Sequence, residues 1–385
     1  MRALILGGAG AVCKEATRDL ALTSDFEEIA VADANPAAVE RLLGEIGDPR
    51  LRPLSFDAND YDGMLRLFPQ YELVVNGLPF QFDLTVNRAC VESGVNGLDL
   101  SSLDEQFGLH AIASEKQMIF VPGVGATPGV TNLMVARAAE QLDRLDTVEI
   151  AFAAFRSLAP APGLLTTTLW EFDPEEEARQ QAVYEDGAWH HSPPLSGGKH
   201  FQFHDLIGEQ ATYFVPHDEV YTLPRSFPSL RRVSVRGCFP PRVMELMSAL
   251  LHTGILGLDT IQLDGREVSA METIRALLWQ NPVSKQNPVW AYGLVVEVTG
   301  ERAGRQVLHR YRNHHPPQQE WGGESAYYKN VGLPLSIGAQ MIARGEVRGH
   351  GVLPPERAFR VAPFFQALAD RGITIEETVE ELSPA

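Results

Sequence analysis

The sequence RALILGGAGAVC, residues 2–13, is the strongest indication of the fold. Residues 2–6 form a short apolar run of the kind that becomes a buried parallel strand, and a helical pattern follows the glycines. A glycine-rich turn between a strand and a helix presents backbone N–H groups to a pyrophosphate. We therefore expect a dinucleotide site in which Gly8 makes the tight turn and Gly10 lets the phosphates approach. Cys13 stands where the G-x-G-x-x-G fingerprint has its third glycine.

A carboxylate follows the second apolar run. Residues 28–32 read EIAVA and lead to Asp33, at about the spacing where a dinucleotide fold places an acceptor for the ribose hydroxyls. The alternative is that Asp33 caps the helix that begins near Pro36. A 2′-phosphate beside this carboxylate would be repelled by roughly 1–4 kcal/mol per charge pair at 4 Å. Because residues 34–39 contain no Lys or Arg, we expect NAD, with NADP the less favoured cofactor.

The composition of the chain indicates which classes of partner and which compartment to expect. Its 50 acidic and 32 basic residues give a net charge of −18, which argues against nucleic acid and membrane surfaces as partners, since both are negatively charged. The three cysteines (Cys13, Cys90 and Cys238) are far apart, which indicates a reducing compartment and no disulfide framework. No apolar run approaches the ~20 residues of a membrane span, and the N-terminus reads as a core strand. We therefore expect a cytoplasmic protein.

Short apolar runs alternate with helical patterns up to about residue 125, for example at 51–56 and 71–75. This alternation predicts βαβ units and a doubly wound parallel sheet, whose ligands bind beyond the carboxyl ends of the strands. Two acids, Asp57 and Asp99, stand at such ends. Both are candidate site residues, Asp99 as a catalytic group, although each could instead cap a helix.

The pattern changes to a mixture of antiparallel strands and helices from about residue 147, with a helix expected over 166–183. The sequence therefore predicts an α/β protein with a second, α+β domain. Its expected parts are a Rossmann domain over residues 1–125, a substrate and dimerisation domain over 126–330, and C-terminal helices over 331–385 that return to the first domain.

Two side chains of the second part are candidates for chemistry. His217 stands beside two acids and could relay a proton at neutral pH, or the segment could be an exposed turn. Arg236 is flanked by valines in an apolar strand, so it needs a carboxylate partner, either internal or that of a substrate. The paired histidines at 190–191 and 314–315 lack ligand spacing, so we expect no metal site.

Six segments in this order resemble the saccharopine dehydrogenase family, and within it the lysine 6-dehydrogenase branch. They are LILGGAG at 4–10, DAN at 33–35, VNGLP at 75–79, GATPGVTN at 125–132, VSVR at 233–236 and GVLPPE at 351–356. The family often has T-L-R followed by an aromatic residue where this chain has Ser234-Val235-Arg236-Gly237.

The resemblance implies an amino-acid dehydrogenase that acts at a C–N bond and forms a homodimer through its second domain. The residues it places at the nucleotide are Gly8, Gly10, Ala11, Val12, Asp33, Ala34, Asp57, Ala58, Leu78 and Pro79, with Ala126 and Pro128 nearer the nicotinamide. Those it places at the substrate are Ser101, Thr127, His217, Ser234, Val235 and Arg236.

The expected reaction is hydride transfer from the amine-bearing carbon to nicotinamide, giving an imine that water hydrolyses. A neutral His217 would accept the amine proton and Arg236 would hold the α-carboxylate. Two alternatives stay open: reductive condensation of an aldehyde with an amine, as in carboxynorspermidine formation, and a nucleotide-sensing protein without turnover. Acidic residues around the substrate would favour a polyamine, and paired Arg or Lys a substrate with two carboxylates.

Overall fold

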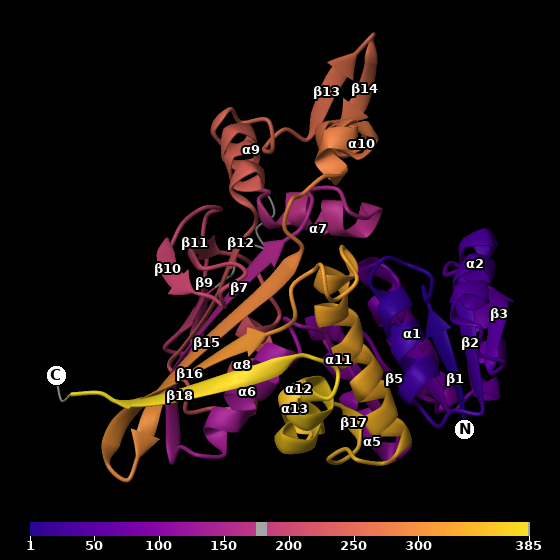
Figure 1. The fold of residues 1–385 in the computed structure, drawn as a ribbon, viewed down its shortest axis with the longest axis horizontal. Helices are drawn as coiled ribbons and strands as arrows, with labels where there is room; N and C mark the ends of the chain where they lie inside the picture. Colours follow the sequence, from indigo (N-terminus) through magenta and orange to yellow (C-terminus); the bar gives the residue numbers. More distant parts are fainter. Residues whose placement is uncertain (175–182, 384–385) are drawn as a thin grey trace. The chain divides into compact units, whose positions relative to one another are not determined.

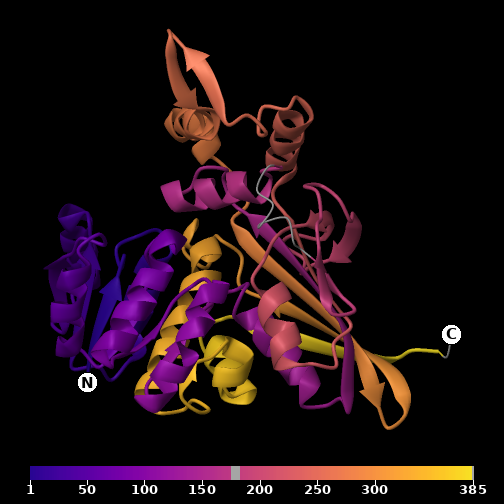
Figure 2. The same ribbon diagram turned by 180° about the vertical axis from the view of Figure 1, so that it is seen from behind.

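The structure is a computed structural model and describes residues 1–174 and 183–383. The chain forms two compact units (Figures 1 and 2). Unit 1 comprises Met1–Arg137 and Tyr328–Thr374, and unit 2 comprises Ala138–Tyr327 and Ile375–Ala385. Each unit is therefore built from two segments that are separate in the sequence.

The described strands of unit 1 form a seven-stranded sheet. They are β1 (Arg2–Leu6), β2 (Glu28–Asp33), β3 (Leu51–Ser55), β4 (Leu73–Asn76), β5 (Asn96–Leu98), β6 (Ile119–Val121) and β17 (Gly351–Val352). Their order is β17-β6-β5-β4-β1-β2-β3, and every neighbouring pair is parallel. This is the doubly wound parallel sheet that the alternation of apolar runs and helices predicts.

Helices connect these strands and complete the unit. They are α1 (Cys13–Thr23), α2 (Pro36–Ile46), α3 (Tyr61–Leu67), α4 (Asp83–Ser93), α5 (His110–Glu115), α6 (Val130–Ala139), α11 (Ser325–Ala343), α12 (Pro355–Ala358) and α13 (Val361–Ala369). The expected C-terminal return is present, because β17 pairs with β6 and Arg371 forms a 2.8 Å ion pair with the buried Asp19 of α1.

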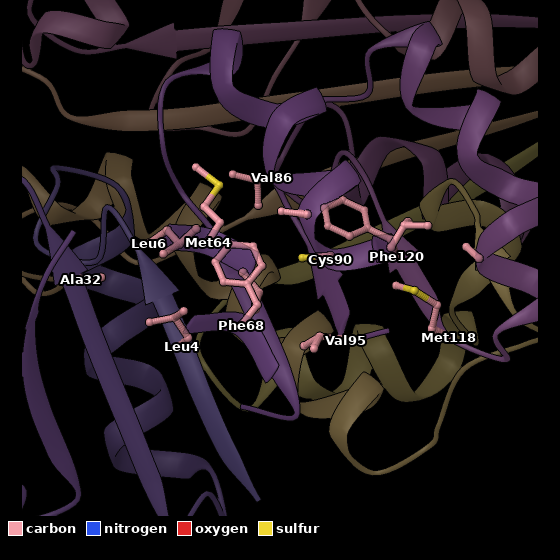
Figure 3. Close-up of a cluster of buried hydrophobic side chains, with 14 of the residues drawn as sticks. Leu4, Leu6, Ala32, Met64, Phe68, Val86, Cys90, Val95, Met118 and Phe120 are labelled. Carbon is pink, nitrogen blue, oxygen red and sulfur yellow. The ribbon is translucent and has the colours of Figure 1, made fainter. Parts of the chain in front are cut away.

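A hydrophobic core holds the βα units of unit 1 together (Figure 3). Leu4 and Leu6 of β1 belong to the same cluster as Met64 and Phe68, which lie in and just after α3, and all four are fully buried. Burying a side chain of this size stabilises the fold by about 1.5–3 kcal/mol. This apolar packing fixes the position of β1, and with it the glycine turn that follows.

The described strands of unit 2 form a nine-stranded mixed sheet. Its strands are β7 (Arg144–Phe155), β8 (Val183–Glu185), β9 (Ala188–His190), β10 (Lys199–Gln202), β11 (Glu209–Phe214), β12 (Arg232–Cys238), β15 (Ala291–Arg302), β16 (Arg305–His314) and β18 (Thr374–Glu381). The main path runs β10-β11-β12-β7-β15-β16-β18. The last strand, β18, thus belongs to the second sheet, whereas the sequence suggested that residues 331–385 return to the first domain.

Among the described residues, four α-helices and a separate hairpin complete unit 2. They are α7 (Pro162–Glu171), α8 (Glu219–Ser226), α9 (Pro241–His252) and α10 (Ala270–Gln280), with the hairpin of β13 (Thr260–Leu263) and β14 (Arg266–Ser269) projecting beside α10 (Figure 1). The helix expected over 166–183 begins earlier and ends at Glu171, and residues 175–182 lie outside the described part of the chain. No helix within the described ranges is long and apolar enough to cross a membrane.

The register of the second sheet divides its side chains between two faces. Phe152 of β7 lies opposite Gly237 of β12 and Leu294 of β15, while Arg236 lies opposite Ala151. Because directly paired residues share a face and successive residues alternate, Phe152 and Arg236 point to opposite faces. We call these the Phe152 face and the Arg236 face.

Candidate functional site

The glycine turn after β1 has the geometry of a phosphate-binding loop. Gly7 has a φ of +67°, and a Cβ there would lie 2.7 Å from the carbonyl oxygen of Gly77. A Cβ on Gly8 would lie 2.8 Å from Val31, so Gly8 permits close packing. The left-handed turn is therefore made by Gly7, one residue before the position that the fingerprint suggested, and a Cβ on Gly10 would meet the oxygen of Gly7 at 3.0 Å.

Cys13 fits in place of the third glycine because Gly77 leaves room for it. A Cβ on Gly77 would lie 1.9 Å from the Sγ of Cys13. Burial, with smaller contributions from the charges of Asp33 and Asp83, raises the pKa of the Cys13 thiol to about 12. Cys13 is thus a packing residue, and its presence leaves the turn intact.

Asp33 lies over this turn at the end of β2. Its Oδ2 accepts a hydrogen bond from the N–H of Ala9 at 3.3 Å, and its Oδ1 accepts one from Asn35 at 3.0 Å. The cap of α2 is Asn35, whose side chain accepts from Ala38. The helix-capping alternative for Asp33 is therefore not what the structure has. Among the described residues, Asp33 makes no ion pair, and the glycine turn, the start of α1 and this carboxylate together fit a dinucleotide.

The remaining nucleotide candidates lie in the loops after the strands of unit 1. Asp57 follows β3 and accepts two hydrogen bonds from Asn59, which lower the pKa of its carboxyl. The N–H of Leu78 donates to Asn76 at the end of β4. The others share this location in strand-to-helix loops: Ala11, Val12, Ala34, Ala58, Pro79, Ala126 and Pro128.

Both carboxylate oxygens of Asp99 accept hydrogen bonds from other residues of unit 1. It is fully buried after β5, where Oδ2 accepts from Gln106 at 2.7 Å and Oδ1 accepts from the N–H of Gly123 at 3.0 Å. These contacts fix the start of the turn that contains Ala126, Thr127 and Pro128. The geometry therefore favours a positioning role for Asp99 over the catalytic one that its place in the sequence suggested.

Two of the segments that carry the family resemblance meet in unit 1. Asn132 of α6 accepts from the N–H of Gly129 at 2.9 Å and donates to Glu356 of α12 at 2.9 Å, although 224 residues separate the last two. Both side chains are buried. The 125–132 turn is thus held by the GVLPPE segment, and Ser101 and Thr127 lie partly exposed in the loops of this unit.

Unit 2 gathers ionisable side chains on the Phe152 face. The ring of His217 lies 5.5 Å from that of Phe152, and the ring of Tyr292 lies 6.4 Å from Phe152 and 5.1 Å from Tyr327. Nδ1 of His217 is 2.6 Å from Oε2 of Glu219, whose side chain is fully buried. The set that we call the Glu171 cluster consists of Arg156, Glu171, His217, Glu219, Tyr292 and Tyr327.

Arg156 follows β7 and joins it to α7. Its guanidinium lies 5.2 Å from the ring centre of Phe239 and 5.6 Å from that of Tyr327. It is buried, and every nitrogen of the guanidinium donates to oxygen within unit 2. The acceptors are the hydroxyl of Tyr327, the carbonyls of Ser157, Leu158 and Leu164, and the hydroxyl of Thr168.

The cluster shifts two protonation equilibria. Burial raises the pKa of Glu171 to about 7, against the opposing charges of His217 and Arg156. Burial lowers the pKa of His217, but the charge and hydrogen bond of Glu219, together with the charges of Asp218 and Glu171, outweigh burial and raise it to about 9. This direction favours an imidazolium at neutral pH over the neutral base that the sequence suggested.

Arg236 has an internal partner on the opposite face. Its Nη1 lies 3.1 Å from Oε1 of Glu149 and 3.0 Å from Oγ of Ser234, and its Nε donates to the carbonyl of Gly197. Lys199 also contacts Glu149, and the guanidinium lies 4.2 Å from the ring centre of Phe214. Of the two partners left open by the sequence, the structure has the internal carboxylate.

The structure thus separates the candidates of unit 2. His217 lies on the Phe152 face, as does the fully buried Val235, while Ser234 and Arg236 lie on the other. Sequence reasoning missed Arg156, Glu171, Tyr292 and Tyr327. Arg156 directly follows an apolar strand, the same signal that singled out Arg236, but nothing in the sequence marks the other three.

The part of the chain that is described contains no group of three or more His, Cys, Asp or Glu side chains that could hold a metal ion. The histidines at 314 and 315 instead contact Glu376 and the backbone of Tyr292, respectively. Unit 1 defines a dinucleotide-binding α/β protein, and unit 2 adds a domain with buried ionisable groups.

Comparisons with known proteins identify the class. Residues 3–121 match the family model described as the saccharopine dehydrogenase NADP binding domain, and residues 125–373 match the saccharopine dehydrogenase C-terminal domain. The chain is therefore an oxidoreductase with a nicotinamide dinucleotide cofactor. It belongs to the saccharopine dehydrogenase family.

Individual relatives match over nearly the full chain. Carboxyaminopropylagmatine dehydrogenase of Synechocystis is 23% identical over 396 residues, covering 98% of each chain. Carboxynorspermidine synthase of Vibrio alginolyticus is 24% identical over 417 residues, covering 99% of this chain and 98% of that protein. The structure of saccharopine dehydrogenase (L-Glu forming) from Saccharomyces cerevisiae has a TM-score of 0.71 at 14% identity, covering 98% of this chain and 99% of that chain, and shows the same fold.

The pairing of Arg236 with Glu149 predicts a structural role. We expect Arg236→Ala to lower the free energy of unfolding by about 3 kcal/mol, at the low end for breaking a buried pair because Glu149 keeps Lys199. Denaturant unfolding measures this, with Arg232→Ala on the same face and strand as the control. Unchanged stability together with a fall in kcat/KM would instead place Arg236 at the substrate.

Proposed function

We propose that the protein oxidises or forms a C–N bond in an amine that carries a carboxyl group. In this proposal unit 1 binds the dinucleotide and the Glu171 cluster of unit 2 binds the amine. The observation on which the proposal rests is the cluster itself, where two acids, Glu171 with a buried oxygen that is unpartnered among the described residues and the fully buried Glu219, both interact electrostatically with the buried Tyr292. Buried charges are costly, so such a group of side chains is a candidate functional site.

The charges of unit 2 favour an amine over a second carboxylate as the group recognised. Within the described residues, the guanidinium of Arg156 is fully used by oxygens of unit 2, and Arg236 is paired with Glu149. Neither cation is therefore available without breaking internal bonds. A substrate with two carboxylates, as in a saccharopine-type reaction, would need a free cation for its second carboxylate. Arg236, which the sequence suggested for this role, is already paired with Glu149.

The names of the relatives support the same choice. Carboxyaminopropylagmatine dehydrogenase and carboxynorspermidine synthase are both named after an amine with a carboxyl group. We therefore favour reductive condensation, in which an aldehyde and an amine form an imine that is then reduced, over the lysine 6-dehydrogenase type. A homodimer through unit 2 stays a prediction for light scattering to test.

The residues of unit 1 have defined tasks in this reaction. Backbone N–H groups of the Gly7–Gly10 turn would hold the pyrophosphate, and Asp33 would accept from the ribose hydroxyls. A nicotinamide held there supplies a hydride donor or acceptor. In unit 2, the aromatic rings of Phe152, Tyr292 and Tyr327 would exclude water from the amine. The ion pair of His217 with Glu219 would hold both side chains in one position.

A substrate panel tests the proposed function. We expect oxidation of NADH when agmatine or 1,3-diaminopropane is offered with a carboxylated aldehyde such as succinic semialdehyde or glyoxylate, and a secondary amine as the product by mass spectrometry. Lysine with NAD is the comparison for the lysine 6-dehydrogenase type. Tight binding of a dinucleotide without turnover in either direction would favour the nucleotide-sensing alternative.

We also propose that NAD is preferred, because Asp33 stands where a 2′-phosphate would lie and makes no ion pair among the described residues. Asp33→Ala should weaken NAD binding by about 10- to 150-fold, the range for hydrogen bonds to a charged group. Calorimetric titration of both cofactors measures this, with the exposed Asp62→Ala as control. Equal or tighter binding of NADP to the wild type would contradict the preference.

A further inference from the structure

Glu171 differs from the other charged members of the Glu171 cluster. Its Oε2 is buried and has no hydrogen-bond partner among the residues that the structure describes. It is also the last residue of α7, where the partial negative charge of the helix C-terminus disfavours a carboxylate. Both features cost free energy, and internal bonds of the described chain do not offset that cost.

The groups that face Glu171 come from four separate segments. They are Arg156 after β7, His217 before α8, Tyr292 in β15 and Tyr327 at the start of α11, and each interacts electrostatically with Glu171. The imidazole of His217 is already bonded to Glu219, and the guanidinium of Arg156 is already bonded to five oxygens. The two cations therefore act on Glu171 through their fields, and its carboxylate is left able to accept a proton.

We propose that Glu171 binds the ammonium group of the amine substrate and exchanges a proton with its nitrogen. This inference rests on the proposed function, and it assigns the base to a residue that the sequence did not mark. In the oxidative direction, an N–H bond of the ammonium breaks, its electron pair stays on nitrogen, and an O–H bond forms on Glu171. In the reductive direction, the carboxylic acid returns that proton to the neutral amine product.

The protonation states suit this exchange. A carboxyl group with a pKa near 7 is populated in both forms at neutral pH, which is the condition for an efficient general acid or base. His217, with a pKa near 9, keeps its proton over the same range and serves as a fixed positive charge. In this proposal the base is thus Glu171, whereas the sequence suggested His217 for that role.

The test replaces Glu171 with glutamine, which keeps the size of the side chain and removes the proton acceptor. In the direction of amine oxidation, the wild type should lose activity as pH falls through about 7. Glu171→Gln should lower kcat by about 10²–10⁴-fold and flatten this limb. In Glu171→Asp the activity should still fall at acidic pH, but at a different pH from the wild type. The control variant is Glu245→Gln, which replaces an exposed glutamate of α9 and should behave as wild type.

A second measurement does not need turnover. Calorimetry of agmatine binding at pH 7, in two buffers of different ionisation enthalpy, counts the protons exchanged on binding. We expect proton exchange in the wild type and in Glu245→Gln, and its loss together with weaker binding in Glu171→Gln. The variant should remain folded, since a carboxyl whose pKa is raised in the folded state makes the protein less stable as pH rises through about 7.

The outcomes separate this inference from the proposed function. Proton-linked agmatine binding that depends on Glu171, without redox turnover, would keep the inference and contradict the proposed function. Turnover by Glu171→Gln within threefold of wild type, with the acidic limb unchanged, would overturn the inference and leave the proposed function standing. Equal agmatine binding and proton exchange in both proteins would also overturn it.

Discussion

The alternation of side chains along β7 determines which residues of unit 2 can act together. Glu149 and Phe152 are three positions apart on this strand and therefore point to opposite faces. Arg236 joins Glu149 on one face, and His217 packs beside Phe152 on the other. A single small substrate cannot bond to both Arg236 and His217, because the backbone of the sheet lies between them.

The two faces of the sheet differ in how completely their charged side chains are paired with one another. On the Arg236 face, acids and bases alternate in a network, with Glu149 between Arg236 and Lys199, and Glu297 between Lys199 and Arg310. Each charge there has an opposite neighbour within the sheet. The charges of this network are paired without a ligand. Removing one of its members should therefore change the free energy of unfolding more than it changes activity.

On the Phe152 face the internal pairing is incomplete. Glu219 pairs with His217, and Arg156 is satisfied by neutral oxygens, so within residues 1–174 and 183–383 no acid is bonded to its charge. Glu171 lies within the fields of both cations but has a buried oxygen without a hydrogen bond among the described residues. The buried oxygen of Glu171 can accept a hydrogen bond from an N–H group of a ligand, and this is the physical reason for placing the amine here.

The fold and the nucleotide site could be predicted because their signals are local. The apolar strand at residues 2–6, the glycines and Asp33 lie within one βαβ unit, and the structure places them at one loop. The left-handed residue of the turn is Gly7 rather than Gly8, and a side chain at Gly7 would also collide with the backbone of Gly77.

The substrate side could not be predicted in the same way. The partner of Arg236 is 87 residues away in sequence, and the pKa of His217 depends on Glu171 of another helix as well as on its neighbour Glu219. Glu171 itself is an ordinary helical glutamate until the chain folds. Only the tertiary arrangement distinguishes Glu171 from the other acidic residues of the chain, which has 50 in all.

The division of roles in the Glu171 cluster depends on a charged imidazolium at His217, so the pKa of His217 is the quantity to measure. NMR titration of the histidine ring resonances, assigned with His217→Gln, measures it. We predict a pKa of about 9 for His217 in the wild type and a lower pKa in Glu219→Gln, because burial then loses the strongest interaction that opposes it. A wild-type His217 that titrates at or below 6.5 would contradict the account.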